Sequence, residues 1–192
     1  MTDGVKWVVG AIFGMLVIAS VLIRVLPHKK GSESFVELKK RVQSWWVMVF
    51  VFAGALLLDQ RLSVVMFALV SFLALKEYVS AIPTRRVDRR VLFWAYLSIP
   101  VQYYFAGTGY YGMFIIFIPV YLFLLIPLRL VLAGETKGFL RSAGTIHWGL
   151  MVTVFSLSHA AFLLSLENGA GLLLFLVVVT QCNDVAQFIS GK

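Results

Sequence analysis

The sequence predicts an all-α protein, a polytopic membrane helix bundle. Of its 192 residues, 60% are hydrophobic and only 14% are charged, whereas soluble globular proteins carry about 25% charged residues. The mean hydropathy of +0.91 agrees with this class. Long apolar runs recur along the whole chain and alternate with short polar loops. Because no polar stretch is long enough to bury a core of its own, we expect a single membrane-embedded domain over residues 1–192.

The apolar runs predict about seven transmembrane helices. They cover residues 5–26, 47–58, 62–75, 91–106, 110–132, 145–166 and 170–189. Pro27 ends the first run, while Pro100, Pro119 and Pro127 interrupt the fourth and fifth. The first run lacks a small-residue cleavage site before the polar segment, so we interpret it as a retained helix rather than a signal peptide.

Residues 33–46 predict one interfacial amphipathic helix between the first two spans. Apolar residues recur there at intervals of three and four: Phe35, Leu38, Val42 and Trp45. Trp45 and Trp46 are typical of the headgroup level of a membrane. The basic residues 39–41 mostly face elsewhere. Two interpretations of Arg41 stay open, namely attraction to anionic lipid and direct contact with a substrate.

The basic residues predict the orientation of the chain. With the N-terminus outside, all of the 17 Lys and Arg residues except Lys6 and Arg61 fall in cytoplasmic segments. This agrees with the positive-inside rule, so we expect a multi-pass protein of the cell (inner) membrane with a cytoplasmic C-terminus. The net charge of +8 then reflects topology and attraction to membrane lipids, with no nucleic-acid partner.

A polar segment follows the last apolar run and differs from all that precedes it. The sequence from Thr180 to Lys192 reads TQCNDVAQFISGK. On a helix, Asn183, Gln187 and Ser190 share one face, and Asp184 lies one position round from it. An ionisable group at the mouth of a membrane helix is functional by default, although a capped helix end with a lysine reaching to the headgroups is the simpler alternative.

Residues 183–192, NDVAQFISGK, resemble the N-D-x-x-[QA]-[FY]-x-x-G-K segment of the phosphatidate cytidylyltransferases, also called CDP-diglyceride synthases. The stretch from Arg41 to Trp46 is similar to a segment after the first span of the bacterial members. The family joins phosphatidic acid and CTP to give CDP-diacylglycerol and pyrophosphate, in phospholipid biosynthesis. The resemblance therefore implies a nucleotidyltransferase whose partners are these two substrates.

The resemblance also implies site residues and a cofactor. Two polyanions meet in this reaction, so the site needs a divalent metal, Mg²⁺, together with cationic side chains. Asp184 is then the catalytic residue and metal ligand. The substrate-binding residues are Asn183, Gln187, Lys192 and Arg41.

This chain departs from the family pattern after Lys192. Members continue with a basic glycine-containing loop, an S-P-x-K-T-x-E-G element and a long signature with a D-R-x-D cluster. We therefore expect the N-terminal part of a larger enzyme: a fragment, a truncated product, or one half of a split enzyme whose second chain carries the signature. The isolated chain is expected to be inactive, and a homodimer stays open.

Two other classes of protein remain as alternatives. A small membrane transporter would use Asp184 and His159 as buried path residues, and a non-catalytic membrane partner subunit would use neither. Transporters commonly carry internal repeats, and the Asp184 segment occurs once. His159 is interpreted as a group that hydrogen-bonds between helices. The single Cys182 forms no internal disulfide.

Overall fold

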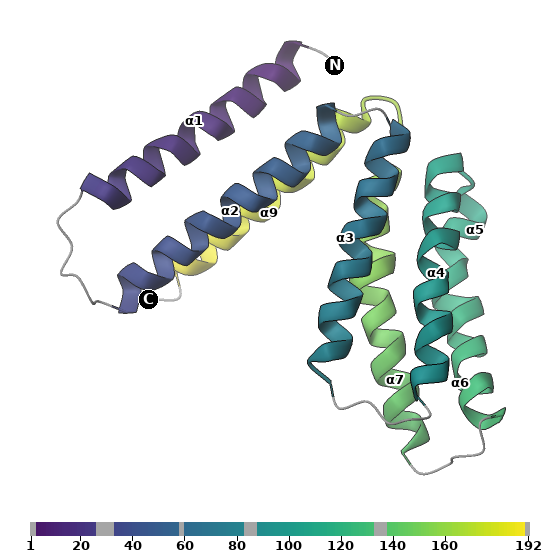
Figure 1. Cartoon of the computed structure of the whole chain (residues 1–192). Helices are drawn as coiled ribbons and strands as arrows, with labels where there is room; N and C mark the ends of the chain where they lie inside the picture. Colours follow the sequence, from purple (N-terminus) through teal and green to yellow (C-terminus); the bar gives the residue numbers. More distant parts are fainter. Residues whose placement is uncertain (1–2, 26–32, 58–59, 83–87, 133–137, 191–192) are drawn as a thin grey trace. The chain divides into compact units, whose positions relative to one another are not determined.

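The computed structural model describes residues 3–25, 33–57, 60–82, 88–132 and 138–190 (Figure 1). Every regular element in these ranges is a helix, as expected for an all-α protein. The helices form two compact units. Unit 1 consists of residues 1–59 and 170–192, and unit 2 consists of residues 60–169. The expectation of one membrane-embedded domain stays a prediction.

Unit 1 contains α1 (Asp3–Val25), α2 (Glu33–Leu57) and most of α9 (Gly169–Ser190). Aromatic contacts join α1 to α2. The Trp46 indole Nε1 donates a hydrogen bond of 3.0 Å to the Ser20 hydroxyl. The ring of Phe13 meets the rings of Trp46 and Phe50 edge-on, at centroid distances of 6.0 and 5.8 Å. Such pairs are worth about 0.5–1.5 kcal/mol beyond the area they bury.

The predicted boundary between an interfacial helix and the second span is wrong. The structure joins residues 33–46 and 47–57 into the single helix α2. Neither Pro nor Gly interrupts the sequence from residue 33 to residue 53, so nothing there ends the helix. Trp46 faces α1, and Val42 is buried. Of the four apolar residues of the amphipathic pattern, Val42 is buried and Trp45 is partly buried, while the side chains of Phe35 and Leu38 lie outside the described residues.

Unit 2 is a bundle of four helical segments (Figure 1). The first two are α3 (Gln60–Ser80) and α4 (Asp88–Thr108). The third consists of α5 (Tyr111–Ile116), the π-helical turn η1 (Phe117–Leu122) and α6 (Phe123–Leu132). The fourth consists of α7 (Phe139–Leu150), the π-helical turn η2 (Met151–Phe155) and α8 (Ser156–Leu163). Contacts between sequence neighbours and between α3 and the fourth segment close the bundle.

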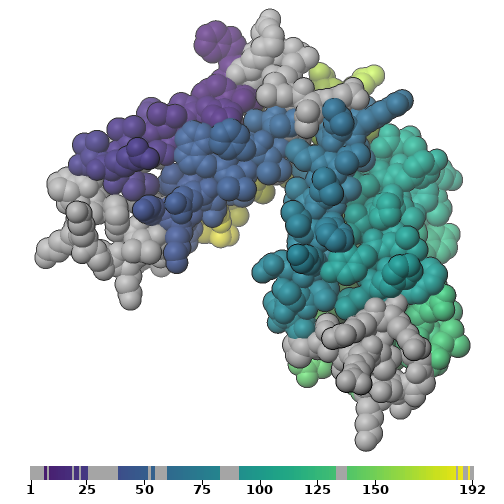
Figure 2. All heavy atoms as spheres, viewed as in Figure 1, coloured from purple at the N-terminus to yellow at the C-terminus, as the bar shows by residue number. Residues whose placement is uncertain are grey.

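Large apolar side chains are exposed on unit 2, as lipid-facing residues are. Examples on α3, α4 and α6 are Leu69, Leu73, Phe93, Leu124 and Leu128. Figure 2 shows the surface of unit 2 over α3 and α4, coloured by position in the sequence. Within the described ranges, three helical segments are long and apolar enough to cross a membrane: Gln60–Ser80, Tyr111–Leu132 and Phe139–Leu163. Val9–Val25 and Gly169–Asp184 are shorter apolar helices. The protein is therefore a membrane protein, and the count of seven spans stays a prediction.

Polar side chains lie inside unit 2 and bond to one another. The hydroxyls of Ser71 on α3 and Tyr103 on α4 share a buried hydrogen bond of 2.6 Å. Gln102, fully buried beside Tyr103, donates from Nε2 to the carbonyl of Phe114 and to the hydroxyl of Ser158, both at 3.1 Å. Gln102 thus links three of the four segments of the bundle.

The bond from Gln102 to Phe114 joins α4 to the end of α5, just before the π-helical turn η1. Pro119 lies inside that turn and has no N–H to donate. Among the described residues, Oε1 of the same Gln102 side chain is buried without a hydrogen-bond partner. In lipid, backbone and side-chain polar groups can bond only within the protein, so the two bonds from Nε2 fix how α4 lies against α5 and α8.

Gly149 on α7 gives a test of helix packing in unit 2. A Cβ at this position would lie 2.4 Å from Cε1 of Tyr78, whose hydroxyl donates to the carbonyl of Thr145 at 3.0 Å. We expect Gly149→Ala to destabilise the protein by about 1–3 kcal/mol, as overpacking does. Gly144→Ala is the matched control, because a Cβ at Gly144 meets no atom within 4 Å. Thermal unfolding in detergent measures both, and equal melting temperatures would contradict the packing described.

The adjacent residues Tyr103 and Tyr104 test the buried hydroxyl pair. Tyr103 is 3% exposed and bonded to Ser71, whereas Tyr104 is 66% exposed. Tyr103→Phe leaves the Ser71 hydroxyl without this partner, so we expect a loss of about 0.6–1.7 kcal/mol, the range for such bonds in membrane bundles. Tyr104→Phe should change the unfolding free energy little. A Tyr103→Phe variant as stable as Tyr104→Phe would show that the bond contributes nothing.

Candidate functional site

Helix α9 carries the predicted polar segment at its C-terminal end. A tight turn precedes the helix: Asn168 has a left-handed backbone, with φ of 57°, and Gly169 donates to the carbonyl of Leu166. A Cβ at Gly169 would lie 2.3 Å from the backbone oxygen of Leu163, so only glycine fits there. The helix then runs through apolar residues to Val179 and becomes polar from Thr180 onward.

The structure places the predicted site residues on the exposed surface of this polar end. Asn183, Asp184, Gln187 and Ser190 are all exposed. The Ser190 hydroxyl donates to the carbonyl of Ala186 on its own helix. Lys192 lies outside the described residues. The roles of these residues stay predictions, and their shared helix agrees with the expected spacing.

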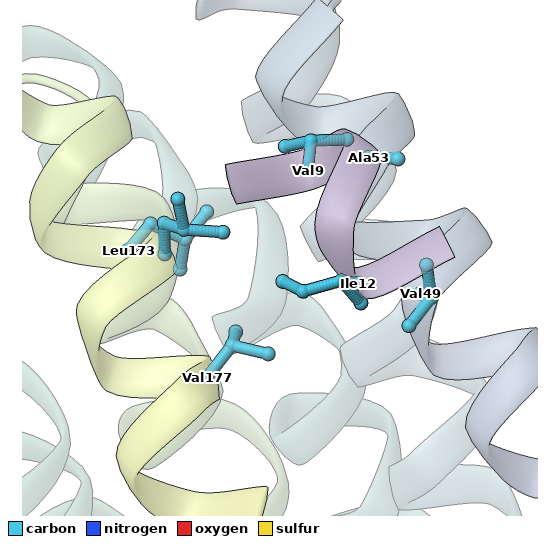
Figure 3. A pocket seen from close by; sticks show the side chains of 7 residues that line it. Val9, Ile12, Val49, Ala53, Leu173 and Val177 are labelled. Carbon is cyan, nitrogen blue, oxygen red and sulfur yellow. The ribbon is translucent and has the colours of Figure 1, made fainter. Parts of the chain in front are cut away.

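The opposite face of α9 packs within unit 1. There α1, α2 and α9 surround a small apolar hollow of about 30 Å³ (Figure 3). Its lining residues are Val9, Ile12, Val49, Ala53, Leu173, Leu174 and Val177. Leu173 and Val177 are buried, one turn apart on α9. Figure 3 shows them opposite Ile12 of α1, with Val49 and Ala53 on the neighbouring turns of α2.

Helices α2 and α9 run antiparallel. The Gln181 amide Nε2 contacts the Met48 sulfur at 3.8 Å. Val49 and Ala53 follow Met48 on α2, and they line the hollow together with Leu173 and Val177, which precede Gln181 on α9. A residue nearer the N-terminus of α2 therefore lies beside a residue nearer the C-terminus of α9.

This register places Arg41 beside the polar end of α9. Arg41 precedes Met48 by seven residues, so it lies at the level of the last turn of α9, about seven residues after Gln181. Asp184 lies one turn closer, at the level of Trp45. Arg41 is partly buried and Asp184 is exposed. The fold thus brings Arg41, Asp184 and Gln187 to one end of unit 1.

The chemistry of this end suits a phosphate or a hard cation. Carboxylate and amide oxygens are ligands that Mg²⁺ accepts, and it keeps several waters and substrate oxygens besides. A guanidinium binds phosphate through two parallel hydrogen bonds. Across the described ranges, no three His, Cys, Asp or Glu side chains gather as a metal cluster. An ion at Asp184 would take its other ligands from water, from substrate or from residues outside those ranges.

Sequence reasoning missed Gln181, the residue that joins the polar end of α9 to α2. Its amide is partly buried and contacts Met48, a partner 133 residues away. A signal exists in the sequence, because Gln181 continues the spacing of Leu173 and Val177 at intervals of four. A polar residue on an apolar face predicts a partner, although the sequence does not say which.

The two histidines of the sixth predicted span belong to unit 2. His159 Nδ1 lies 2.8 Å from the carbonyl of Phe155 on its own helix. Its ring packs against Phe114 and Phe155, at centroid distances of 4.8 and 4.6 Å. His147 packs edge-on against Phe123. His159 thus makes a packing contact with α5, while its hydrogen bond stays within its own helix.

Comparison with known proteins identifies the family. A family model described as "Cytidylyltransferase family" matches residues 39–192, which include Arg41 and the whole of α9. An Escherichia coli (strain K12) protein described as "Uncharacterized protein YnbB" is 37% identical over 190 residues. The alignment covers 94% of this chain and 61% of that relative, so the chain spans about three fifths of its length. No solved structure matches. The chain belongs to the cytidylyltransferase family.

Proposed function

We propose that the protein contributes to a phosphatidate cytidylyltransferase, which converts CTP and phosphatidic acid to CDP-diacylglycerol and pyrophosphate. Membership of the cytidylyltransferase family supports a CTP-using nucleotidyltransferase. One observation supports a lipid as the second substrate: the NDVAQFISGK motif begins near the end of an apolar helix in a membrane protein. A polar site there is within reach of a lipid headgroup and of water.

The reaction sets the requirements of the site. An oxygen of the lipid phosphate attacks the α-phosphorus of CTP, a new P–O bond forms, and pyrophosphate leaves with the electrons of the broken bond. Both reactants are polyanions, so their approach is opposed unless cations neutralise them. Arg41 of α2 would bind a phosphate, and Lys192 would add a point charge.

Asp184 is the proposed ligand of Mg²⁺. Its exposed carboxylate and the amide oxygens of Asn183 and Gln187 fit the donor set of this ion. When bound, the ion would neutralise phosphate charge and help to align the reactants. Asn183 and Gln187 would orient water or phosphate around it, as groups of an outer ligand shell do. Further ligands are proposed to come from outside the described residues, including a second chain or a second copy of this one.

The role of Asp184 is tested by Asp184→Asn in the chromosomal gene, so that any further segment or chain is present. The amide keeps the shape of the side chain but removes the charge that binds Mg²⁺. We expect formation of CDP-diacylglycerol to fall by about a hundredfold or more, because loss of several kcal/mol of stabilisation lowers a rate tenfold for each 1.4 kcal/mol or so.

Glu167→Gln is the control for this substitution, because it removes an exposed carboxylate from the turn before α9. Formation of CDP-diacylglycerol is measured in membrane extracts of the wild-type, Asp184→Asn and Glu167→Gln strains, over a range of CTP and Mg²⁺ concentrations. Protein level and melting temperature should match in all three. Near-normal turnover in Asp184→Asn would mean that Asp184 has only a structural role in α9.

The proposed orientation has the N-terminus outside and the C-terminus in the cytoplasm. Cys182 is the only cysteine, so Cys182→Ser gives a background for single-cysteine labelling. A cysteine in residues 83–90 should react with an impermeant maleimide only after the membrane is opened, and one at Arg61 should react in intact cells. The opposite pattern would reverse the topology.

A further inference from the structure

Positive charge is concentrated at one end of unit 2, which we call the basic end (Figure 1). At this end α3 and α6 stop and α4 and α7 begin. Residues 76–90 and 129–141, which include these helix ends, carry eight basic and three acidic residues. The rest of unit 2 has two charged residues, Arg61 and Glu167. The basic end therefore attracts anions.

Arg129 lies in the last turn of α6 and is the one charged residue in the segment Tyr111–Leu132. This segment is long and apolar enough to cross a membrane. Arg129 follows Tyr111 at a rise of about 27 Å along the helix, and the hydrocarbon core of a bilayer is about 30 Å thick. Tyr110 and Tyr111 are exposed, and exposed tyrosines are typical of a membrane surface. Placing these tyrosines at one surface of the bilayer puts Arg129 at the headgroup level of the other.

Trp94 on α4 holds the guanidinium of Arg129 in place. The guanidinium carbon lies 4.5 Å from the centroid of the Trp94 ring, which is a cation–π contact. Trp94 is partly buried and Arg129 is exposed. Among the described residues, none forms an ion pair or a hydrogen bond with Arg129. Its N–H donors are thus available at the surface, and a stacked guanidinium loses less freedom when it binds a phosphate.

Apolar side chains adjoin this pair on the side away from the basic end. Leu97 lies one turn after Trp94 on α4 and is 44% exposed. Leu125 lies one turn before Arg129 on α6 and is partly buried. A lipid whose phosphate accepts hydrogen bonds from Arg129 can therefore lay its acyl chains along apolar side chains.

We propose that Arg129 and Trp94 form a binding site for an anionic phospholipid of the bilayer, a phosphate diester such as phosphatidylglycerol. The surplus of positive charge at the basic end favours an anionic lipid over a zwitterionic one. The stacked guanidinium fixes where the phosphate lies, so the lipid is held at one position. This inference does not depend on the proposed reaction.

A site differs from general attraction in one respect that can be measured. General attraction of anionic lipid to basic loops depends on the number of charges. At a site, the contribution of an arginine also depends on the ring that positions it. Loss of Trp94 should then weaken lipid binding although every charge is kept.

The test compares variants that lose the same group at different places. Arg129→Gln removes the stacked guanidinium, and Arg141→Gln removes an exposed arginine of α7 at the same end. Trp94→Leu removes the ring under Arg129, and Trp148→Leu removes a ring of α7 that is 66% exposed. Each purified protein is titrated in detergent micelles with dioleoyl phosphatidylglycerol or dioleoyl phosphatidylcholine. Native mass spectrometry gives the apparent Kd of the first lipid bound.

We expect the wild-type protein to bind phosphatidylglycerol more tightly than phosphatidylcholine. Arg129→Gln should raise the Kd of phosphatidylglycerol by about tenfold or more, as loss of a hydrogen bond to a charged group does. Trp94→Leu should raise it by severalfold, and the two α7 variants should bind like the wild type. Equal losses in Arg129→Gln and Arg141→Gln, or an unchanged Kd in Trp94→Leu, would overturn the proposal.

Melting temperatures show that the variants fold and give a second readout. Phosphatidylglycerol should raise the melting temperature of the wild type and of Arg141→Gln more than that of Arg129→Gln, because a ligand that binds only the folded state stabilises it. If Arg129→Gln does not fold, the comparison of Trp94→Leu with Trp148→Leu decides. A loss of affinity in both tryptophan variants would then overturn the proposal.

Phosphatidic acid separates this site from the proposed substrate site. Its phosphate is a monoester, so a substrate site should prefer it strongly to phosphatidylglycerol. We expect the two lipids to compete at Arg129 with similar Kd values. A strong preference for phosphatidic acid that Arg129→Gln abolishes would assign the site to the substrate and overturn the proposal. Normal CDP-diacylglycerol formation in Asp184→Asn would count against the proposed function and leave this site standing.

Discussion

Buried hydrogen bonds between helices hold unit 2 together, because a polar group inside an apolar bundle can bond only within the protein. The amide Nε2 of Gln102 on α4 donates to the carbonyl of Phe114 on α5. The same amide reaches Ser158, so one side chain ties α4 to α5 and α8. Because water cannot replace these partners in lipid, the buried hydrogen bonds restrict how the helices can slide or rotate.

Unit 1 differs from unit 2 in where its polar side chains lie. Its described core is apolar, and its polar side chains lie at one end. Its core contacts are aromatic and aliphatic: Phe13 and Trp46 join α1 to α2, and Leu173 and Val177 face the hollow. The polar residues gather instead on the last three turns of α9, where Asn183, Asp184, Gln187 and Ser190 are exposed and Gln181 is partly buried. The apolar contacts thus set the register of α2 on α9, and that register brings Arg41 and Asp184 to the same end of unit 1.

Composition and motif predicted the class and the family, because both depend on residue types that are visible in the sequence. The expected spans match helices at α3, α4 and α9, and the resemblance to cytidylyltransferases is confirmed by the family match. The predicted end of the amphipathic helix at residue 46 was wrong, because no Pro or Gly stops the helix there and α2 continues to Leu57. Periodicity shows that a face is apolar but not what covers it.

The packing of α2 against α9 is the part of the site that could not be predicted from the sequence. Arg41 and Asp184 were each predicted as site residues, one by the basic stretch and the other by the motif. Their placement at the same end of unit 1, about one turn apart, follows only from the contact of Met48 with Gln181. Only the tertiary contact between α2 and α9 shows that the two predicted residues belong to the same end of unit 1.

The order of the helices along the chain has a consequence for synthesis. Unit 2 is one continuous stretch, whereas unit 1 takes its first two helices from the start of the chain and its third from residues 170–192. At roughly 5–20 residues per second, the ribosome needs on the order of 7–27 s to pass from Met48 to Gln181, 133 residues later. During that time α1 and α2 lack their third partner. The end of unit 1 that holds Arg41 is therefore completed only after all of unit 2 has been translated.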